Sequence, residues 1–175
     1  NQIRIQGVKK LKEVSYNIMP DRIETGTFLC YAAMTGGLIT LNDVNFENVL
    51  PVLSKLEESG CKIYREKNKI ILEAPKRLKA VDIQTLPYPG FPTDMQSVFL
   101  SMLTTAKGTS IVTENIFENR FKCVSELTRM GAKISVSGSC AVVKGVRKLV
   151  AANLMATDLR GGAALVGAAI KAKGI

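Results

Sequence analysis

The chemistry open to this chain is limited first by what it lacks, because its 175 residues include no histidine. Proton transfer must therefore fall to carboxylates, Lys, Tyr or Cys, and nucleophiles that depend on a Ser–His or Cys–His pair are excluded. Among the carboxylates, Asp94 lies in the stretch Phe91–Gln96, directly before the apolar run Ser97–Leu103. An Asp at this position can act as a general base, or it can cap the helix that the apolar run predicts.

The four cysteines argue against metal chemistry and against disulfides. They form no C-x-x-C pair and show no metal-ligand spacing; they are Cys30, Cys61, Cys123 and Cys140. Without histidine, a zinc site is disfavoured, and scattered unpaired cysteines are typical of a reducing cytosol. Cys61 aligns with Ala132 in the internal repeat described below, which predicts a small core residue rather than a reactive thiol.

The charge balance suggests an anionic partner. A net charge of +9, from 24 Lys and Arg against 15 Asp and Glu, fits anionic substrates, nucleic acid or an anionic membrane. The basic residues are spread along the sequence, and no apolar run approaches the roughly 20 residues of a membrane span. Nucleic-acid-binding modules usually cluster Arg and Lys with exposed aromatics, whereas aromatics are only 6% of this chain. Three classes stay open here: part of an enzyme, a nucleic-acid-binding module, and a domain that binds a regulator.

An internal repeat organises the elements that must position Asp94. Versions of the Asp-led helix start recur at Asp21 and Asp158, and Leu78 lies 71 residues before Leu149. A period near 70 residues predicts a repeated βαβαββ unit, in one domain over residues 1–175 with units at about 9–75, 76–146 and 147–175. The third unit is truncated in this sequence. The first helix of each unit is apolar or small nearly all round, which favours an interior position.

The expected fold is therefore α/β, a three-fold prism with helices inside and sheets outside. Helices are expected over residues 21–35, 46–59, 94–106, 121–130 and 158–171. Strands are expected over residues 3–8, 14–18, 38–41, 61–64, 69–72, 81–85, 109–113, 132–136, 140–144 and 151–155.

Four stretches together resemble one enzyme family. They are Pro20–Gly26, Phe91–Gln96, Ile116–Phe121 and Ala156–Arg160, and the match runs over essentially the whole chain. The family is UDP-N-acetylglucosamine 1-carboxyvinyltransferase, the enolpyruvyl transferase that starts bacterial peptidoglycan synthesis in the cytoplasm. 3-Phosphoshikimate 1-carboxyvinyltransferase shares the fold but not these motifs. The resemblance implies a two-domain enzyme that needs no cofactor or metal, of which this chain is most of the second domain.

The resemblance also implies roles for individual residues. Asp94 matches the aspartate that contacts the sugar 3-hydroxyl and is its candidate base, and Ile116 matches a position whose backbone binds the nucleotide sugar. Arg120 and Arg160 match cleft arginines near the reacting phosphate; the alternative is an ion pair with Glu118 or Asp158. The implied partners are UDP-N-acetylglucosamine, phosphoenolpyruvate and the enzyme's first domain. The catalytic cysteine, a lysine and a late arginine lie outside this sequence, so the isolated chain is expected to be inactive.

Overall fold

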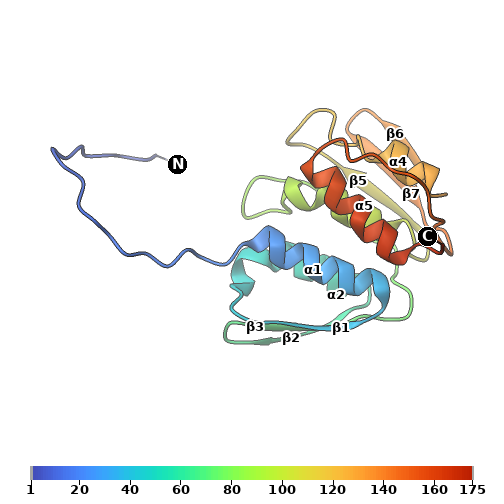
Figure 1. The fold of residues 1–175 in the computed structure, drawn as a ribbon, viewed down its shortest axis with the longest axis horizontal. Helices are drawn as coiled ribbons and strands as arrows, with labels where there is room; N and C mark the ends of the chain where they lie inside the picture. Colours follow the sequence, from blue (N-terminus) through green and yellow to red (C-terminus); the bar gives the residue numbers. More distant parts are fainter. Residues whose placement is uncertain (1, 175) are drawn as a thin grey trace.

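Three helices form the centre of the molecule, between two sheets. The computed structural model describes residues 2–174. Helices α1 (Arg22–Thr35), α3 (Gln96–Leu103) and α5 (Leu159–Lys171) contact one another pairwise. One sheet lies on the outer side of α1 and the other beyond α3 and α5 (Figure 1). This arrangement, with helices inside and sheets outside, is the expected α/β architecture.

The first sheet has three antiparallel strands in the order β1-β3-β2. These are β1 (Leu38–Leu41), β2 (Lys62–Glu66) and β3 (Lys69–Glu73). The short helix η1 (Phe46–Val49) and α2 (Leu50–Glu58) connect β1 to β2. Pro51 lies in the first turn of α2, where its missing N–H leaves no helical bond unmade. Val52, Leu53 and Leu56 of α2 are buried, so the helix covers the sheet with its apolar face.

The second sheet has four strands in the order β4-β5-β7-β6. They are β4 (Ile83–Gln84), β5 (Thr109–Thr113), β6 (Lys133–Ser137) and β7 (Cys140–Lys144). Strand β4 runs parallel to β5, and the other neighbours are antiparallel, with Ile111 opposite Val142. Helix α4 (Val124–Arg129) connects β5 to β6, while η2 (Thr93–Met95) leads into α3. Element for element, this half reproduces the predicted βαβαββ order.

Three predicted strands are not formed. Residues 2–20 contain neither helix nor strand and are exposed, and Figure 1 shows them extending away from the helices. The strands expected over residues 3–8 and 14–18 are therefore wrong for this structure, and the first sheet has three strands. Residues 151–155 also form no strand, although Val150 makes an isolated bridge with Lys173. Alternating apolar residues need a neighbouring strand to pair their backbone groups, and within residues 2–174 these segments have none.

All three repeated aspartates stand at helix starts, as predicted, but they do not act alike. Asp21 caps α1 by accepting from Ile23 N at 2.6 Å, and Asp158 caps α5 by accepting from Gly161 N at 2.7 Å. Asp94 lies within η2, whose N-cap is Pro92, and its side chain makes no cap bond. The helix-cap alternative for Asp94 is therefore wrong, because its carboxylate has other partners.

Close packing of the central helices depends on small residues of α5. Every residue of α3 is buried, and a Cβ at Gly167 would lie only 2.8 Å from the ring of Tyr31. The Tyr31 hydroxyl donates to Ala163 O at 2.7 Å, and Ser101 Oγ donates to Ala164 O at 2.8 Å. The backbone of α5 is thus hydrogen-bonded to both neighbouring helices. No helix within residues 2–174 is long and apolar enough to cross a membrane.

Candidate functional site

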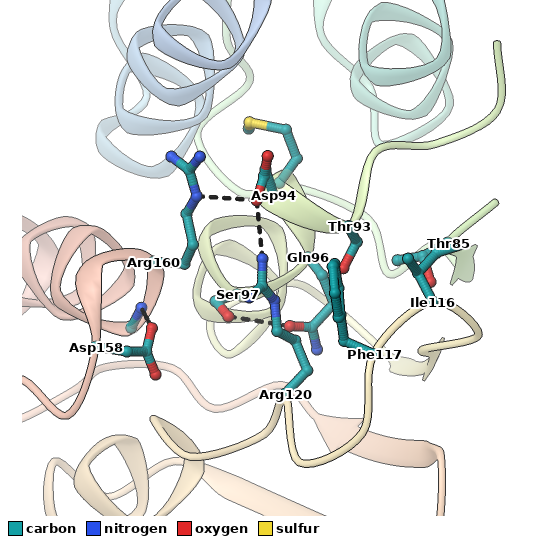
Figure 2. A network of polar contacts seen from close by, with 12 residues as sticks. Thr85, Thr93, Asp94, Gln96, Ser97, Ile116, Phe117, Arg120, Asp158 and Arg160 are labelled. Atoms are coloured by element: carbon teal, nitrogen blue, oxygen red, sulfur yellow. Dashed lines mark hydrogen bonds and ion pairs between the residues drawn. The ribbon is translucent and has the colours of Figure 1, made fainter. Parts of the chain in front are cut away.

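Two arginines form ion pairs with the same carboxylate oxygen of Asp94. Arg120 Nη2 lies 2.8 Å from Asp94 Oδ1, and Arg160 Nε lies 3.0 Å from the same atom (Figure 2). The three side chains are partly buried, with exposed fractions of 38% for Asp94, 23% for Arg120 and 31% for Arg160. Two cations around one anion leave a net charge of +1, so the cluster is suited to an anionic ligand.

These residues come from three separate parts of the chain. Asp94 lies in the turn before α3, Arg120 follows β5, and Arg160 lies in the first turn of α5. The packing of α3 against α5 therefore brings Arg160 to Asp94. The alternative partners expected for the arginines, Glu118 and Asp158, are wrong, since both arginines form ion pairs with Asp94 instead.

The second carboxylate oxygen of Asp94 remains available. Both ion pairs fall on Oδ1, and within residues 2–174 no hydrogen bond or ion pair reaches Oδ2. Two buried donors of nearby residues also have no partner in the described part of the chain, namely Arg120 Nε and Gln96 Nε2. Buried donors without partners are uncommon in folded proteins. A carboxylate oxygen held in place but unpaired can accept a proton from a ligand hydroxyl.

Ile116 is one of the residues that line a separate hollow. The hollow has a volume of about 490 Å³ and is lined by residues 114–121 together with Gly138 and Ser139. Arg120 belongs both to this lining and to the ion pairs with Asp94, so it connects the two places. Its guanidinium also lies 5.1 Å from the centre of the Phe117 ring. Asp94 and Arg160 are not part of the lining.

The interpretation of the sequence missed one residue, Glu114. It is only 3% exposed, and its carboxylate accepts four hydrogen bonds, from two threonine hydroxyls and from the backbone of Ile116 and Phe117. The only signal in the sequence was an acidic residue directly after a predicted strand, which is common at the surface. Its burial depends on contacts between segments that no local pattern reveals.

Three of the cysteines, Cys30, Cys61 and Cys123, are buried in the core. Burial raises the pKa of the Cys30 and Cys61 thiols, and it raises the pKa of Cys123 to about 11. A buried thiol that stays protonated is a poor nucleophile. Cys61 is 5% exposed, as is Ala132 at the equivalent place in the repeat, which confirms the prediction of a small core residue.

Comparison with known proteins agrees with these features. The family model described as EPSP synthase (3-phosphoshikimate 1-carboxyvinyltransferase) matches residues 1–175. The chain is 54% identical over 98% of its length to UDP-N-acetylglucosamine 1-carboxyvinyltransferase 1 of Caldanaerobacter subterraneus, and it spans 41% of that relative. It is 49% identical to a UDP-N-acetylglucosamine 1-carboxyvinyltransferase of Desulfofundulus thermocisternus, covering 98% of this chain and 71% of the relative.

Solved structures show the same fold. An enolpyruvyl transferase from Streptomyces tendae superposes with a TM-score of 0.74 at 23% identity, over 87% of this chain and 37% of that one. EPSP synthase from Acinetobacter baumannii gives a TM-score of 0.69 at 15% identity, over 91% of this chain and 39% of that one. The family-model match over the whole chain and the identity of about one half to these relatives lead to one conclusion. This chain belongs to the EPSP synthase family of enolpyruvyl transferases, among the UDP-N-acetylglucosamine 1-carboxyvinyltransferases.

Proposed function

We propose that this chain supplies one wall of the active site of an enzyme that joins phosphoenolpyruvate to UDP-N-acetylglucosamine. The enzyme transfers the enolpyruvyl group to the sugar 3-hydroxyl, in the first committed step of peptidoglycan synthesis, in the cytoplasm. The observation that carries the proposal is Asp94, held through Oδ1 by two arginines while Oδ2 has no partner among residues 2–174. The names of the relatives support the substrate; the chain spans 41% of the Caldanaerobacter relative and 71% of the Desulfofundulus relative.

In this proposal Asp94 acts as the general base. A sugar hydroxyl is a poor nucleophile at neutral pH, so its proton must leave as the C–O bond to C2 of phosphoenolpyruvate forms. Asp94 Oδ2 accepts that proton, and the two ion pairs on Oδ1 keep the carboxylate oriented. An acid on the other domain protonates C3 of phosphoenolpyruvate. In the second step C3 loses a proton and phosphate leaves, which restores the double bond.

Arg120, Arg160 and Ile116 bind the substrates in this proposal. The substrates carry a diphosphate, a phosphate and a carboxylate, and fixed cations offset such charge most effectively in a partly buried site. Arg120 and Arg160 supply that charge at the cluster with net charge +1. The backbone of Ile116, which lines the hollow, contacts the nucleotide sugar. The remaining wall belongs to the first domain of the same protein, and neither a metal nor another cofactor takes part.

Phosphate release by the full-length protein tests the proposal. We expect release from phosphoenolpyruvate that depends on UDP-N-acetylglucosamine. If phosphate release depends on 3-phosphoshikimate instead, the enzyme is a 3-phosphoshikimate 1-carboxyvinyltransferase, the activity in the description of the family. The nucleic-acid-binding alternative predicts DNA binding that falls steeply with salt. We expect no such binding, because the two arginines of the site are directed at Asp94 rather than displayed on a basic surface.

A further inference from the structure

Glu114 is a buried carboxylate that has no cationic partner in the part of the chain that the structure describes. Its charge is balanced by four neutral donors within residues 2–174, and this is a strong arrangement because hydrogen bonds to an ionised acceptor are about twice as strong as neutral ones. Oε1 accepts from Thr85 Oγ1 at 2.9 Å, from Ile116 N at 2.9 Å and from Phe117 N at 3.1 Å. Oε2 accepts from Thr93 Oγ1 at 2.9 Å.

These four bonds join the two parts of the candidate site. On one side, Glu114 holds the amides of Ile116 and Phe117, which form the start of the loop around the hollow. On the other side, it holds the hydroxyl of Thr93, the residue directly before Asp94 in the η2 turn. Figure 2 shows Thr93 of η2 near Ile116 and Phe117, which are consecutive residues of the loop after β5.

The loop is held at its base as well. Thr85 Oγ1, which donates to Glu114, accepts from Asn115 N at 2.8 Å, and Thr85 O accepts from the Asn115 side chain at 3.1 Å. Because the amides of Ile116 and Phe117 are occupied by Glu114, their carbonyl oxygens are the backbone groups that remain for a ligand. These two residues therefore present acceptors, and acceptors fit hydroxyl and N–H groups rather than phosphate.

We propose that Glu114 is a positioning residue of the enolpyruvyl transfer, setting the Ile116 backbone against the nucleotide sugar and, through Thr93, the Asp94 carboxylate against the sugar hydroxyl. This inference rests on the proposed function of the site. The proposal assigns different effects to the two sets of hydrogen bonds. The bond from Ile116 N governs the KM for UDP-N-acetylglucosamine, whereas the bond from Thr93 Oγ1 governs kcat.

Three substitutions in the full-length enzyme test the two sides. Thr93→Val keeps the shape of the side chain but removes the bond to Oε2, so kcat should fall by about 10- to 100-fold, the effect of a small misplacement of a reacting group. The KM for UDP-N-acetylglucosamine should change less than about threefold, since Ile116 is still held. Glu114→Ala removes all four bonds, so kcat should fall and that KM should also rise, by about tenfold or more.

Glu114→Gln is the conservative rescue, and Asp82→Asn is the matched control. The amide oxygen of Gln can keep the three donors on Oε1, and its NH₂ can donate to Thr93 Oγ1, so both parameters should stay within about fivefold of wild type. Asp82 is an exposed carboxylate at the same sheet that accepts from Ile111 N at 2.7 Å. Its loss should leave kcat and both KM values unchanged. A urea unfolding curve for each variant shows whether it is folded under the assay conditions.

The outcomes are decisive in each direction. A kcat for Thr93→Val within twofold of wild type overturns the proposal, as does Glu114→Gln behaving like Glu114→Ala. If Glu114→Ala does not fold, Thr93→Val and Glu114→Gln decide between positioning and a purely structural role. A purely structural role predicts lower urea midpoints with unchanged kcat and KM. Absence of phosphate release by the wild-type enzyme would overturn the proposed function itself, and that result is distinct from all of these.

Discussion

Replacing Asp94 by Asn in the full-length enzyme separates its base function from its structural role. The two side chains have the same size, so the amide oxygen can take the place of Oδ1 and keep both arginine contacts. The NH₂ group then takes the place of Oδ2, the oxygen that we propose accepts the hydroxyl proton. A donor stands where an acceptor is required. The substitution therefore removes proton acceptance while it leaves the geometry of the cluster nearly intact.

The expected magnitudes follow from exposure and chemistry. Loss of the general base should lower kcat by about 10²- to 10⁴-fold. The two ion pairs involve side chains that are between 23% and 38% exposed, so solvent screens them and each contributes about 0–1 kcal/mol to the free energy of unfolding. The variant should therefore lose less than about 2 kcal/mol and remain folded. Its Kd for UDP-N-acetylglucosamine should change less than about tenfold, because the amide can still hydrogen-bond the hydroxyl.

Steady-state phosphate release, calorimetric binding of UDP-N-acetylglucosamine and urea unfolding measure the three quantities. Asp21→Asn is the internal control, because Asp21 caps α1 with the same kind of side chain and has no arginine partner in the described chain. Asn caps a helix nearly as well as Asp, so this control should change none of the three quantities appreciably. A kcat for Asp94→Asn close to wild type would refute the base assignment. A large loss of nucleotide-sugar binding with unchanged kcat would show that Asp94 only binds the substrate.

Three further predictions concern the chain itself. The thiols of Cys30 and Cys123 have raised pKa values in the folded state, so above pH ~8.5 the unfolded chain loses protons first. The free energy of unfolding, measured with urea, should therefore fall as pH rises, by up to about 1.4 kcal/mol per pH unit for each thiol, and Cys→Ala variants should flatten this slope. A Cβ at Gly145 would collide with Ala106 O, so Gly145→Ala should cost about 1–3 kcal/mol, whereas Gly7→Ala, with nothing within 4 Å, should cost almost none. The isolated 175-residue chain should release no phosphate from phosphoenolpyruvate in the presence of UDP-N-acetylglucosamine, because it supplies only one wall of the proposed site.

Local patterns predicted those parts of the fold that depend on local physics. Helix starts at Asp21 and Asp158 follow from capping, and the hairpin of β6 and β7 follows from alternation around Ser137–Ser139. The segments expected as strands over residues 3–8 and 14–18 have the same alternation, but no strand within residues 2–174 pairs with them. Alternation shows that a segment is able to form a strand, whereas pairing depends on the rest of the molecule.

The sequence predicted which residues belong to the candidate site but not which of them contact one another. The resemblance supplied Asp94, Arg120 and Arg160, yet the expected ion pairs were drawn between sequence neighbours, Arg120 with Glu118 and Arg160 with Asp158. The observed partner of both is Asp94, which is 26 residues from Arg120 and 66 from Arg160. The contact with Arg160 depends on the packing of α3 against α5, and the burial of Glu114 depends on contacts with Thr85 and Thr93. No periodic pattern in the sequence predicts the ion pairs of Asp94 or the burial of Glu114.

The complete burial of α3 sets how the two sides of the site open to solvent. Its residues are all buried, so we expect its backbone amides to exchange hydrogen with water mainly through global unfolding. Residues 118 and 119, just before Arg120, are exposed and lie beyond the bonds that hold Asn115, Ile116 and Phe117, so they can open with far smaller free energies. The carboxylate of Asp94 is thus fixed to the slowest-exchanging part of the molecule, while one of its cationic partners follows a segment that opens readily. The Asp94 carboxylate therefore keeps its position, while the Arg120 guanidinium can adjust to a ligand.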